Sequence, residues 1–247
     1  MASYAAFIRN GTGIAASSLG QKQQIREVEE SKHGPLSGTR CRLVVFDVDG
    51  TLTQVTSIWQ YVHRKLGTWS EGRVSSRKYW RGEISYEEWA RLDAMMWRGR
   101  GVNEIIEIVE SVPYVEGAKH TFSVLRNMGM KIAVASAGLS LLVDRIVRDF
   151  GADLAVANQL IVEDGILTGD VKVNVSLRNK GQVIRDISNG LRVGLNECVV
   201  VGDYSFDFPK DAGLKLAFNP KDQAAEKLAH IIVRSGNLED ILKYISR

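Results

Sequence analysis

Two aspartates, Asp47 and Asp49, stand two residues apart at the end of the short apolar run Val44–Phe46, and Gly50 and Thr51 follow them at once. Such a run is typical of a buried parallel strand, and open α/β sheets bind ligands just beyond the carboxyl ends of these strands. In an extended segment residues i and i+2 share a face, so both carboxylates can address one small site. Like charges this close raise the proton affinity of one member. The pair therefore suits chemistry in which one carboxylate attacks and the other carries a proton.

Two later segments offer groups that bind anions. Ser136 and Ala137 end another apolar run, and a small hydroxyl followed by the N–H groups of a helix start can donate to phosphate oxygens. The alternative role for Ser136 is a helix cap. Lys180 stands at the start of a predicted helix, where the dipole favours anions over cations. This position indicates that Lys180 pairs with an anion, although an ordinary surface lysine is the alternative.

A third segment, Gly202 to Asp207, ends a further apolar run with two acids four residues apart. Hard divalent cations such as Mg²⁺ prefer several oxygen ligands and keep some of their waters. The predicted metal ligands are Asp47, Asp49 and Asp203, with a backbone carbonyl of the first loop among the donors. Asp207 is predicted not to bind the metal directly but to orient waters or loop groups around it. Simple loop capping is the alternative role for Asp207.

The elements that must position these residues alternate between apolar runs and helical segments from Arg42 onward. This alternation predicts an α/β fold, a Rossmann-like parallel sheet with helices on both faces. A hairpin around Asp164-Gly165 is predicted within the series. Beyond the first strand, the predicted strands are 131–136, 154–157, 198–201, 215–218 and 231–233, and the predicted helices are 118–127, 139–149, 180–188 and 238–246.

The segment 57–112 differs in composition from the rest of the chain. It holds all five tryptophans, and spacings such as Trp59, Val62 and Leu66 are typical of helices. Large aromatic side chains at helical intervals predict a small packed helical core. From residue 57 to residue 100 there are nine Lys or Arg residues against five Asp or Glu. This surplus can attract an anionic substrate, or it can simply form a solvated helical surface.

The sequence thus divides into three predicted parts. Residues 1–40 have no long apolar period and are expected to form a flexible N-terminal extension. Residues 41–56 and 113–247 are expected to form the α/β core domain. Residues 57–112 are expected to form a helical domain inserted after the first strand.

The composition narrows the class of protein. A hydrophobic content of 45% and a charged content of 25% are ordinary globular values, and a formal charge of +3 is too small to indicate a nucleic-acid partner. No stretch approaches the roughly 20 apolar residues of a membrane-spanning helix. Cys41 and Cys198 are the only cysteines, and two free buried thiols predict a cytoplasmic protein.

Taken together, the candidate residues resemble the four motifs of the haloacid dehalogenase superfamily of phosphohydrolases. The resemblance covers nearly all of residues 42–247, and it implies that the insert is a helical cap of the type called C1. Within the superfamily the chain is most similar to the phosphoserine phosphatases. The segments that carry this closer similarity are Gly82–Glu88, Tyr114–Ala118, Ala157–Leu160 and Asn179–Gly181.

The sequence departs from the phosphoserine phosphatase pattern where that family binds its substrate. Gly50 stands where the family usually has Ser, and Phe206 stands where it often has Asn. Thr56 occupies the place of a Glu that helps to bind the substrate amine. Counting from a matched tyrosine puts Asp93 at the place of the arginine that binds the substrate carboxylate, with Arg91 close by. The catalytic pattern is therefore retained, whereas the identity of the ester stays open.

The resemblance implies a mechanism. Asp47 attacks phosphorus and forms an aspartyl-phosphate, and Asp49 protonates the leaving group and then deprotonates the hydrolytic water. Mg²⁺ offsets charge repulsion, and Lys180 and Ser136 bind the phosphate oxygens. The acid at position 49 argues against dehalogenation, because a halide needs no proton. The other residues expected to bind phosphate or substrate are Gly50, Thr51, Ala137 and Arg91.

The expected partner is a small-molecule phosphate ester, with no nucleic acid and no membrane, and the chain is expected to be a monomer or a homodimer. Besides a phosphoserine phosphatase-like enzyme, three alternatives remain. These are a phosphatase for another small ester such as a sugar phosphate or phosphoglycolate, a phosphomutase, and a non-catalytic binding module.

Overall fold

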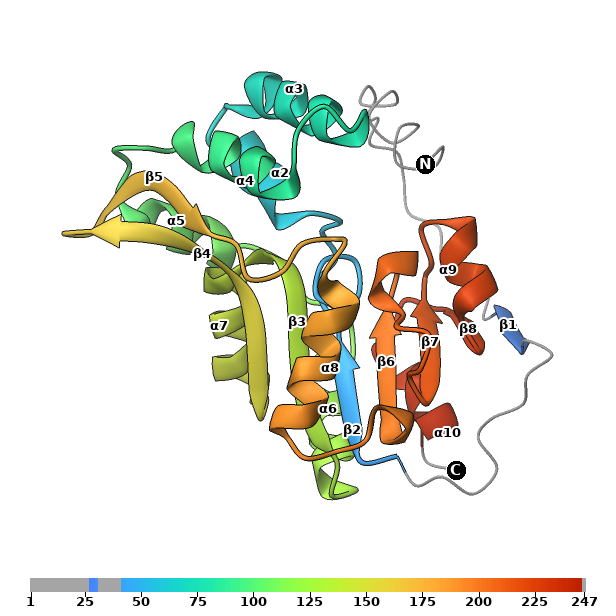
Figure 1. Ribbon diagram of the computed structural model, residues 1–247. Coiled ribbons are helices and arrows are strands. Elements are labelled where there is room, and N and C mark those ends of the chain that lie inside the picture. The colour runs from blue at the N-terminus through green and yellow to red at the C-terminus, as the bar shows by residue number, and fades with distance from the viewer. Residues whose placement is uncertain (1–26, 31–40, 246–247) are drawn as a thin grey trace, which may run out of the picture.

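A computed structural model describes residues 27–30 and 41–245 of the protein, and a single twisted sheet forms its centre (Figure 1). The strands are β1 (Glu27–Glu30), β2 (Leu43–Phe46), β3 (Lys131–Leu139), β4 (Leu154–Glu163), β5 (Ile166–Lys172), β6 (Cys198–Gly202), β7 (Leu214–Phe218) and β8 (Ile231–Arg234). Their order in the sheet is β1-β8-β7-β6-β2-β3-β4-β5. The strands from β8 to β4 in this order are parallel, and β1 and β5 add antiparallel edges.

Helices cover both faces of this sheet. They are α6 (Ala118–Asn127), α7 (Ser140–Phe150), α8 (Lys180–Gly190), α9 (Gln223–Leu228) and α10 (Leu242–Ile245). Side chains of α6, α7 and α10 join one hydrophobic cluster, and those of α8 and α9 join another. Val44 and Phe46 belong to the first cluster and Leu43 and Val45 to the second, because neighbours in a strand point to opposite faces. The predicted Rossmann-like sheet with helices on both faces is confirmed.

The insert between β2 and α6 is helical, as expected, and it lies beyond the carboxyl ends of the central strands (Figure 1). Its helices are α2 (Ile58–Lys65), α3 (Trp69–Trp80), α4 (Tyr86–Met95) and α5 (Val102–Glu110). Serine side chains start two of them: Ser57 accepts the N–H of Gln60 at α2, and Ser85 accepts the N–H of Glu88 at α4. Trp97 is fully buried in the insert.

The predicted hairpin is also present, and it packs against the insert. Asp164 and Gly165 both adopt positive φ angles, 50° and 78°, as a tight turn between antiparallel strands requires. The hairpin of β4 and β5 packs against α4. The backbone N–H of Gly99 donates to Leu167, and that of Val102 donates to Gly165. The end of the hairpin therefore forms part of the surface on which the insert rests.

The structure differs from the sequence-based expectation in several elements. The expected helix 238–246 is a 3-10 turn, η3 (Leu238–Ile241), followed by the single turn of α10. The expected flexible extension contains β1, which pairs with the outer edge of β8 and so satisfies its free backbone groups. The rest of that extension, residues 1–26 and 31–40, lies outside the described residues. Cys198 is buried, as predicted, whereas Cys41 is half-buried.

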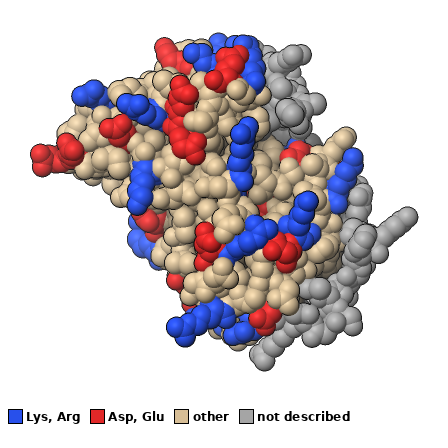
Figure 2. Space-filling view, viewed as in Figure 1, with Lys and Arg blue, Asp and Glu red and all other residues tan. Residues whose placement is uncertain are grey.

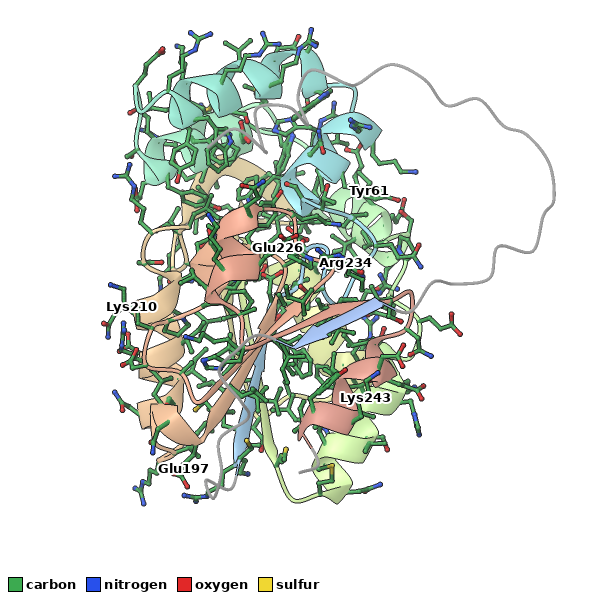
Figure 3. All side chains as sticks on the ribbon, turned by 90° about the vertical axis from the view of Figure 1, so that its right-hand side faces the viewer. Tyr61, Glu197, Lys210, Glu226, Arg234 and Lys243 are labelled. Atoms are coloured by element: carbon green, nitrogen blue, oxygen red, sulfur yellow. The ribbon has the colours of Figure 1, made fainter. Side chains whose placement is uncertain are left out.

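The surface carries both signs of charge. Basic and acidic side chains are interspersed on the face shown in Figure 2. Some of them form ion pairs, such as Arg234 of β8 with Glu226 of α9 at 2.7 Å (Figure 3). None of the helices in the described part of the chain has the length and apolar character needed to cross a bilayer.

Phe122 on α6 provides a test of the core. Its ring is fully buried and lies 5.0 Å from that of Phe46 and 5.3 Å from that of Phe150. Phe122→Ala removes buried apolar area and leaves a cavity, so we expect the free energy of unfolding to fall by about 3–5 kcal/mol. Chemical denaturation measures this change. The control is Val74→Ala on α3, where the side chain is half exposed; equal losses for the two variants would contradict the proposed core.

Candidate active site

The predicted catalytic residues converge at the carboxyl ends of three neighbouring strands. Asp47 follows β2, Ser136 lies in β3, and Asp203 follows β6. The N–H of Asp47 donates to the carbonyl of Val201 at 2.9 Å, which continues the pairing of β2 with β6 into the site. Lys180 reaches the same place from the start of α8. These four side chains share one cavity.

This cavity, about 550 Å³ with the solvent at its mouth included, lies between the sheet and the insert. The core contributes Asp47, Asp49, Thr56, Ser136, Ala137, Gly138, Leu177, Lys180, Asp203, Tyr204 and Phe206, and the insert contributes Ser57, Trp59, Trp80, Tyr86 and Trp89. The tryptophans therefore do more than fill a helical core. Three of the five face the cavity, and sequence spacing alone does not separate them from the buried Trp97.

The first loop turns sharply after β2. The carbonyl of Val48 accepts the N–H groups of Thr51, Leu52 and Thr53, and Gly50 adopts a φ of +85°. A Cβ on Gly50 would lie 2.2 Å from Oδ2 of Asp203. Only glycine therefore meets both the backbone angle and the close approach. Gly50 and Thr51 shape the turn and are not among the residues that line the cavity.

Lys180 lies between two carboxylates. Its side chain is 2% exposed, and Nζ contacts Oδ1 of Asp47 and, at 2.6 Å, Oδ1 of Asp207. Burial alone lowers the pKa of a lysine, but the two carboxylates outweigh that effect and hold the pKa of Lys180 above its ordinary value. The ammonium group is therefore charged and fixes the orientation of Asp47. The predicted pairing of Lys180 with an anion is realised here by protein carboxylates.

Asp207 holds the loop after β6. Its Oδ2 accepts the N–H groups of Asp203 and Tyr204, at 3.1 and 2.9 Å, while Oδ1 accepts from Lys180. A Cβ on Gly202 would lie 2.4 Å from Oδ2 of Asp207, so the strand end has room for this carboxylate only because residue 202 is glycine. Both oxygens of Asp207 are occupied by protein donors. Asp207 therefore positions Lys180 and the loop that carries Asp203.

Asp203 offers an oxygen that no protein group satisfies. The residue is 1% exposed, and its Oδ2 has no hydrogen-bond partner within the described residues. Burial and the nearby charges of Asp47 and Asp207 raise the pKa of Asp203 well above its ordinary value. Oxygen atoms of the three carboxylates lie within 4.8 Å of one another. An unsatisfied oxygen within such a cluster fits a hard divalent cation, which takes oxygen ligands and offsets their repulsion.

Asp49 is placed to carry a proton. Its Oδ2 accepts the N–H of Ile58 at 3.0 Å, and its Oδ1 has no partner in the described part of the chain. Burial is the main cause that raises the pKa of Asp49 to about 7; the Ile58 N–H opposes the shift, and the charge of Asp47 adds to it. Near neutral pH both protonation states of Asp49 are accessible. A general acid that later serves as a base needs this property.

The irregular end of β3, here the Ser136 loop, is held by the insert. Oγ of Ser136 accepts the N–H of Gly138 at 2.9 Å, and α7 begins only at Ser140. Ser136 therefore caps no helix, and its hydroxyl proton can be donated to a ligand. The carbonyl of Ala137 accepts from Trp59 Nε1 at 3.1 Å and from the Tyr86 hydroxyl at 2.5 Å. Two helices of the insert thereby attach to the backbone beside Ser136.

Asn158 on β4 is a positioning residue that sequence reasoning missed. It is fully buried, and its Nδ2 donates to the carbonyls of Ala137 and Val175 at 2.8 and 2.9 Å. Its Oδ1 accepts the N–H groups of Asn174 and Val175. Asn158 thus joins the Ser136 loop to the segment that leads into α8. The one signal for Asn158 in the sequence is its place in Ala157–Leu160, a segment similar to the phosphoserine phosphatases.

Of the residues that depart from the phosphoserine phosphatase pattern, some line the cavity and others do not. Thr56 and Phe206 line the cavity. Arg91 does not; its side chain is 69% exposed and lies 3.6 Å from Asp170 of β5. Asp93 is buried inside the insert, where it accepts the hydroxyl of Ser75 at 2.5 Å. Neither Arg91 nor Asp93 is among the residues that line the cavity.

Comparisons with known proteins identify the family of this chain. A family model described as haloacid dehalogenase-like hydrolase matches residues 44–209. A phosphoserine phosphatase from Methanocaldococcus jannaschii is 34% identical over 207 residues, which are 83% of this chain and 97% of that protein. A substrate-bound phosphoserine phosphatase complex has a TM-score of 0.73 at 30% identity, over 83% of this chain and 99% of that chain.

A phospho-aspartyl intermediate analogue of phosphoserine phosphatase has a TM-score of 0.72 at 31% identity, over 83% of this chain and 99% of that chain. The family model and the 34% identical relative show that the chain belongs to the haloacid dehalogenase-like hydrolases and is an enzyme of that family. Within the family it is similar to the phosphoserine phosphatases.

Replacing Lys180 by Met tests the charge balance of the site. Met retains an apolar stem but leaves Asp47 and Asp207 buried without their ammonium partner, so we expect the free energy of unfolding to fall by about 3–5 kcal/mol. Chemical denaturation in EDTA measures this without compensation by a cation. Lys210→Met is the matched control, because Lys210 lies at the surface (Figure 3). If the two variants lose the same stability, Lys180 is not the counter-ion of the site.

Proposed function

We propose that this enzyme hydrolyses small-molecule phosphomonoesters through an aspartyl-phosphate formed on Asp47. The observation that carries the proposal is the arrangement around Asp47. An ammonium group fixes one of its oxygens, and Asp49, with a pKa of about 7 and an unpartnered oxygen within the described residues, lines the same cavity. The similarity to phosphoserine phosphatases supports the same reaction class.

The first half of the reaction forms the covalent intermediate. A carboxylate oxygen of Asp47 attacks phosphorus, and the bond between phosphorus and the ester oxygen breaks. Protonated Asp49 gives its proton to the departing oxygen, so the alcohol leaves neutral. Ser136 donates its hydroxyl to a phosphate oxygen, and Lys180 keeps Asp47 aligned. The intermediate is the species whose analogue was solved for a related phosphoserine phosphatase.

The second half of the reaction regenerates the enzyme. Asp49, now ionised, takes a proton from a water molecule, which attacks phosphorus and releases inorganic phosphate. Asp47 returns to a carboxylate and Asp49 to its protonated form. One group with an accessible pKa thus serves as acid and then as base.

We also propose Mg²⁺ as the cofactor, held by Asp47 and Asp203, with the Asp49 backbone carbonyl as a third donor. The unsatisfied Oδ2 of Asp203 supports this assignment. When bound, the ion supplies positive charge beside the phosphate oxygens and lowers their repulsion from the carboxylates.

In this proposal the insert, residues 57–112, acts as a cap on a core of residues 41–56 and 113–247. The hydrogen bonds of Trp59 and Tyr86 to Ala137 support that role, because they tie the insert to the phosphate-binding loop. A cap in this position limits the water around the reacting groups and contacts the leaving group.

Asp47→Asn is expected to reduce Mg²⁺-dependent phosphate release by about 10³-fold or more, because an amide is a poor nucleophile. Release is measured with p-nitrophenyl phosphate, and acid-quenched wild-type enzyme is searched by mass spectrometry for phosphate on the peptide with Asp47. Asp186→Asn, a change at an exposed acid of α8, is the control. Substantial turnover by Asp47→Asn would refute the aspartyl-phosphate mechanism.

Asp203→Asn is expected to separate metal binding from stability. The change removes one of several close carboxyl groups, so the metal-free protein should be as stable as wild type or more stable. Mg²⁺ at a hundred times its Kd should stabilise wild type by about 2.7 kcal/mol and the variant far less. Thermal denaturation with and without Mg²⁺ measures both quantities, with the exposed Asp170→Asn as control. The assignment fails if Mg²⁺ stabilises both variants equally.

A further inference from the structure

The part of the cavity that would receive the leaving group is built mostly from rings. Trp80, Tyr86 and Trp89 enter it from the insert, and Tyr204 and Phe206 enter it from the loop after β6. Two elements far apart in the sequence therefore present flat aromatic surfaces to one space. Residue spacing in the sequence gives no binding role to any of these five side chains.

The rings are held in place by one another. On the core side, Tyr204 and Phe206 are stacked, with centroids 5.1 Å apart and planes 7° apart. On the insert side, Trp89 stacks on Tyr79 at 4.8 Å and meets the edge of Tyr86 at 5.6 Å. Side chains that are already ordered lose little conformational freedom when a ligand binds. The cavity is therefore a preformed aromatic site.

The polar groups of these insert side chains are partly committed elsewhere. The Tyr86 hydroxyl donates to Ala137, and so does the indole N–H of the neighbouring Trp59. What these two residues offer a ligand is the ring itself. Thr56 and Ser57 add small uncharged hydroxyl groups to the lining, and the hydroxyl of Ser57 already accepts the N–H of Gln60.

Within the described lining of the cavity, no cation is free to pair with the carboxylate of an amino acid. Among the described residues that line it, Lys180 is the single lysine or arginine, and its ammonium group already contacts Asp47 and Asp207. The exposed Arg91 lies outside the lining. A zwitterion would place its carboxylate against aromatic rings without a paired cation, which is costly on removal from water.

We propose that the enzyme selects phosphate esters whose alcohol is uncharged and carries a flat ring, in preference to phosphoserine and other zwitterionic esters. This inference rests on the proposed phosphatase function and specifies its substrate class. The ring of the alcohol lies against the rings of the insert and of the loop after β6, while its phosphate lies at Asp47. Stacking between rings favours such a ligand beyond the gain from apolar area alone.

The test uses three alkyl phosphates, so that the leaving groups have similar chemistry: 2-phenylethyl phosphate, 2-cyclohexylethyl phosphate and L-phosphoserine. With Mg²⁺ present, we expect kcat/KM for the phenyl ester to exceed that for phosphoserine by about tenfold or more and that for the cyclohexyl ester by about threefold. Phosphoserine as the equal or better substrate would overturn the proposal. Equal values for the phenyl and cyclohexyl esters would overturn the selection for a flat ring.

Binding to the Asp47→Asn variant separates this inference from the proposed function. Calorimetry on that variant gives the Kd of each ester without requiring turnover. If no ester is hydrolysed by wild type but the phenyl ester binds about tenfold more tightly than phosphoserine, the hydrolase proposal fails and the aromatic site stands. Equal Kd values reject the aromatic site, whatever the rates.

Two variants that replace an aromatic residue of the cavity test which rings cause the preference for the phenyl ester. Phe206→Leu in the core loop and Trp89→Leu in the insert are each expected to reduce the ratio of kcat/KM for the phenyl ester to that for phosphoserine by about threefold to tenfold. Trp69→Leu, at the start of α3 and outside the cavity lining, is the matched control and should keep the wild-type ratio. A ratio divides out a partial loss of folded enzyme. If both ring variants keep the wild-type ratio, these rings do not choose the substrate.

Discussion

Four carboxyl groups and one ammonium group share a buried site at the ends of β2 and β6 and the start of α8. Asp47, Asp203 and Asp207 repel one another there, and Lys180 balances only part of their charge. Such a cluster is costly to bury, and breaking any of its pairs costs more. The surrounding backbone is therefore built to hold it, with glycines at positions 50 and 202, where a Cβ would collide with a carboxylate.

The same constraint gives the site its chemistry. Burial and neighbouring charge keep Asp49 near a pKa of 7, while Lys180 stays charged and holds Asp47. Two carboxyl groups two residues apart thus have different surroundings, because one contacts an ammonium group and the other contacts a single backbone N–H. One oxygen of Asp203 has no hydrogen-bond partner within the described residues, which fits a cation at this point.

The insert is coupled to this site through one backbone carbonyl. Ala137 receives hydrogen bonds from Trp59 on α2, Tyr86 on α4 and Asn158 on β4. Movement of the insert would therefore shift the backbone beside Ser136. The aromatic side chains of the insert also form much of the cavity wall, so the element that attaches beside Ser136 also lines the cavity.

The sequence by itself determined where the candidate residues lie, at strand ends and a helix start, and most of the sheet. Asp47, Asp49, Lys180 and Asp203 could be selected as candidates because local spacing, such as two acids after an apolar run, marks their positions. The helix 118–127 was predicted with its observed bounds, since helical periodicity is also local. A parallel sheet with helices on both faces followed from the alternation of these elements.

Only the tertiary structure decided which side chains of the insert face the site. Tyr86 and Trp89 reach the cavity, whereas Arg91 points to solvent and Asp93 into the interior of the insert, although all four lie on α4. The edge strand β1 likewise depends on a partner, β8, two hundred residues further along the chain. Periodicity shows that a helix has faces, but the distant segments that pack on it decide what each face contacts.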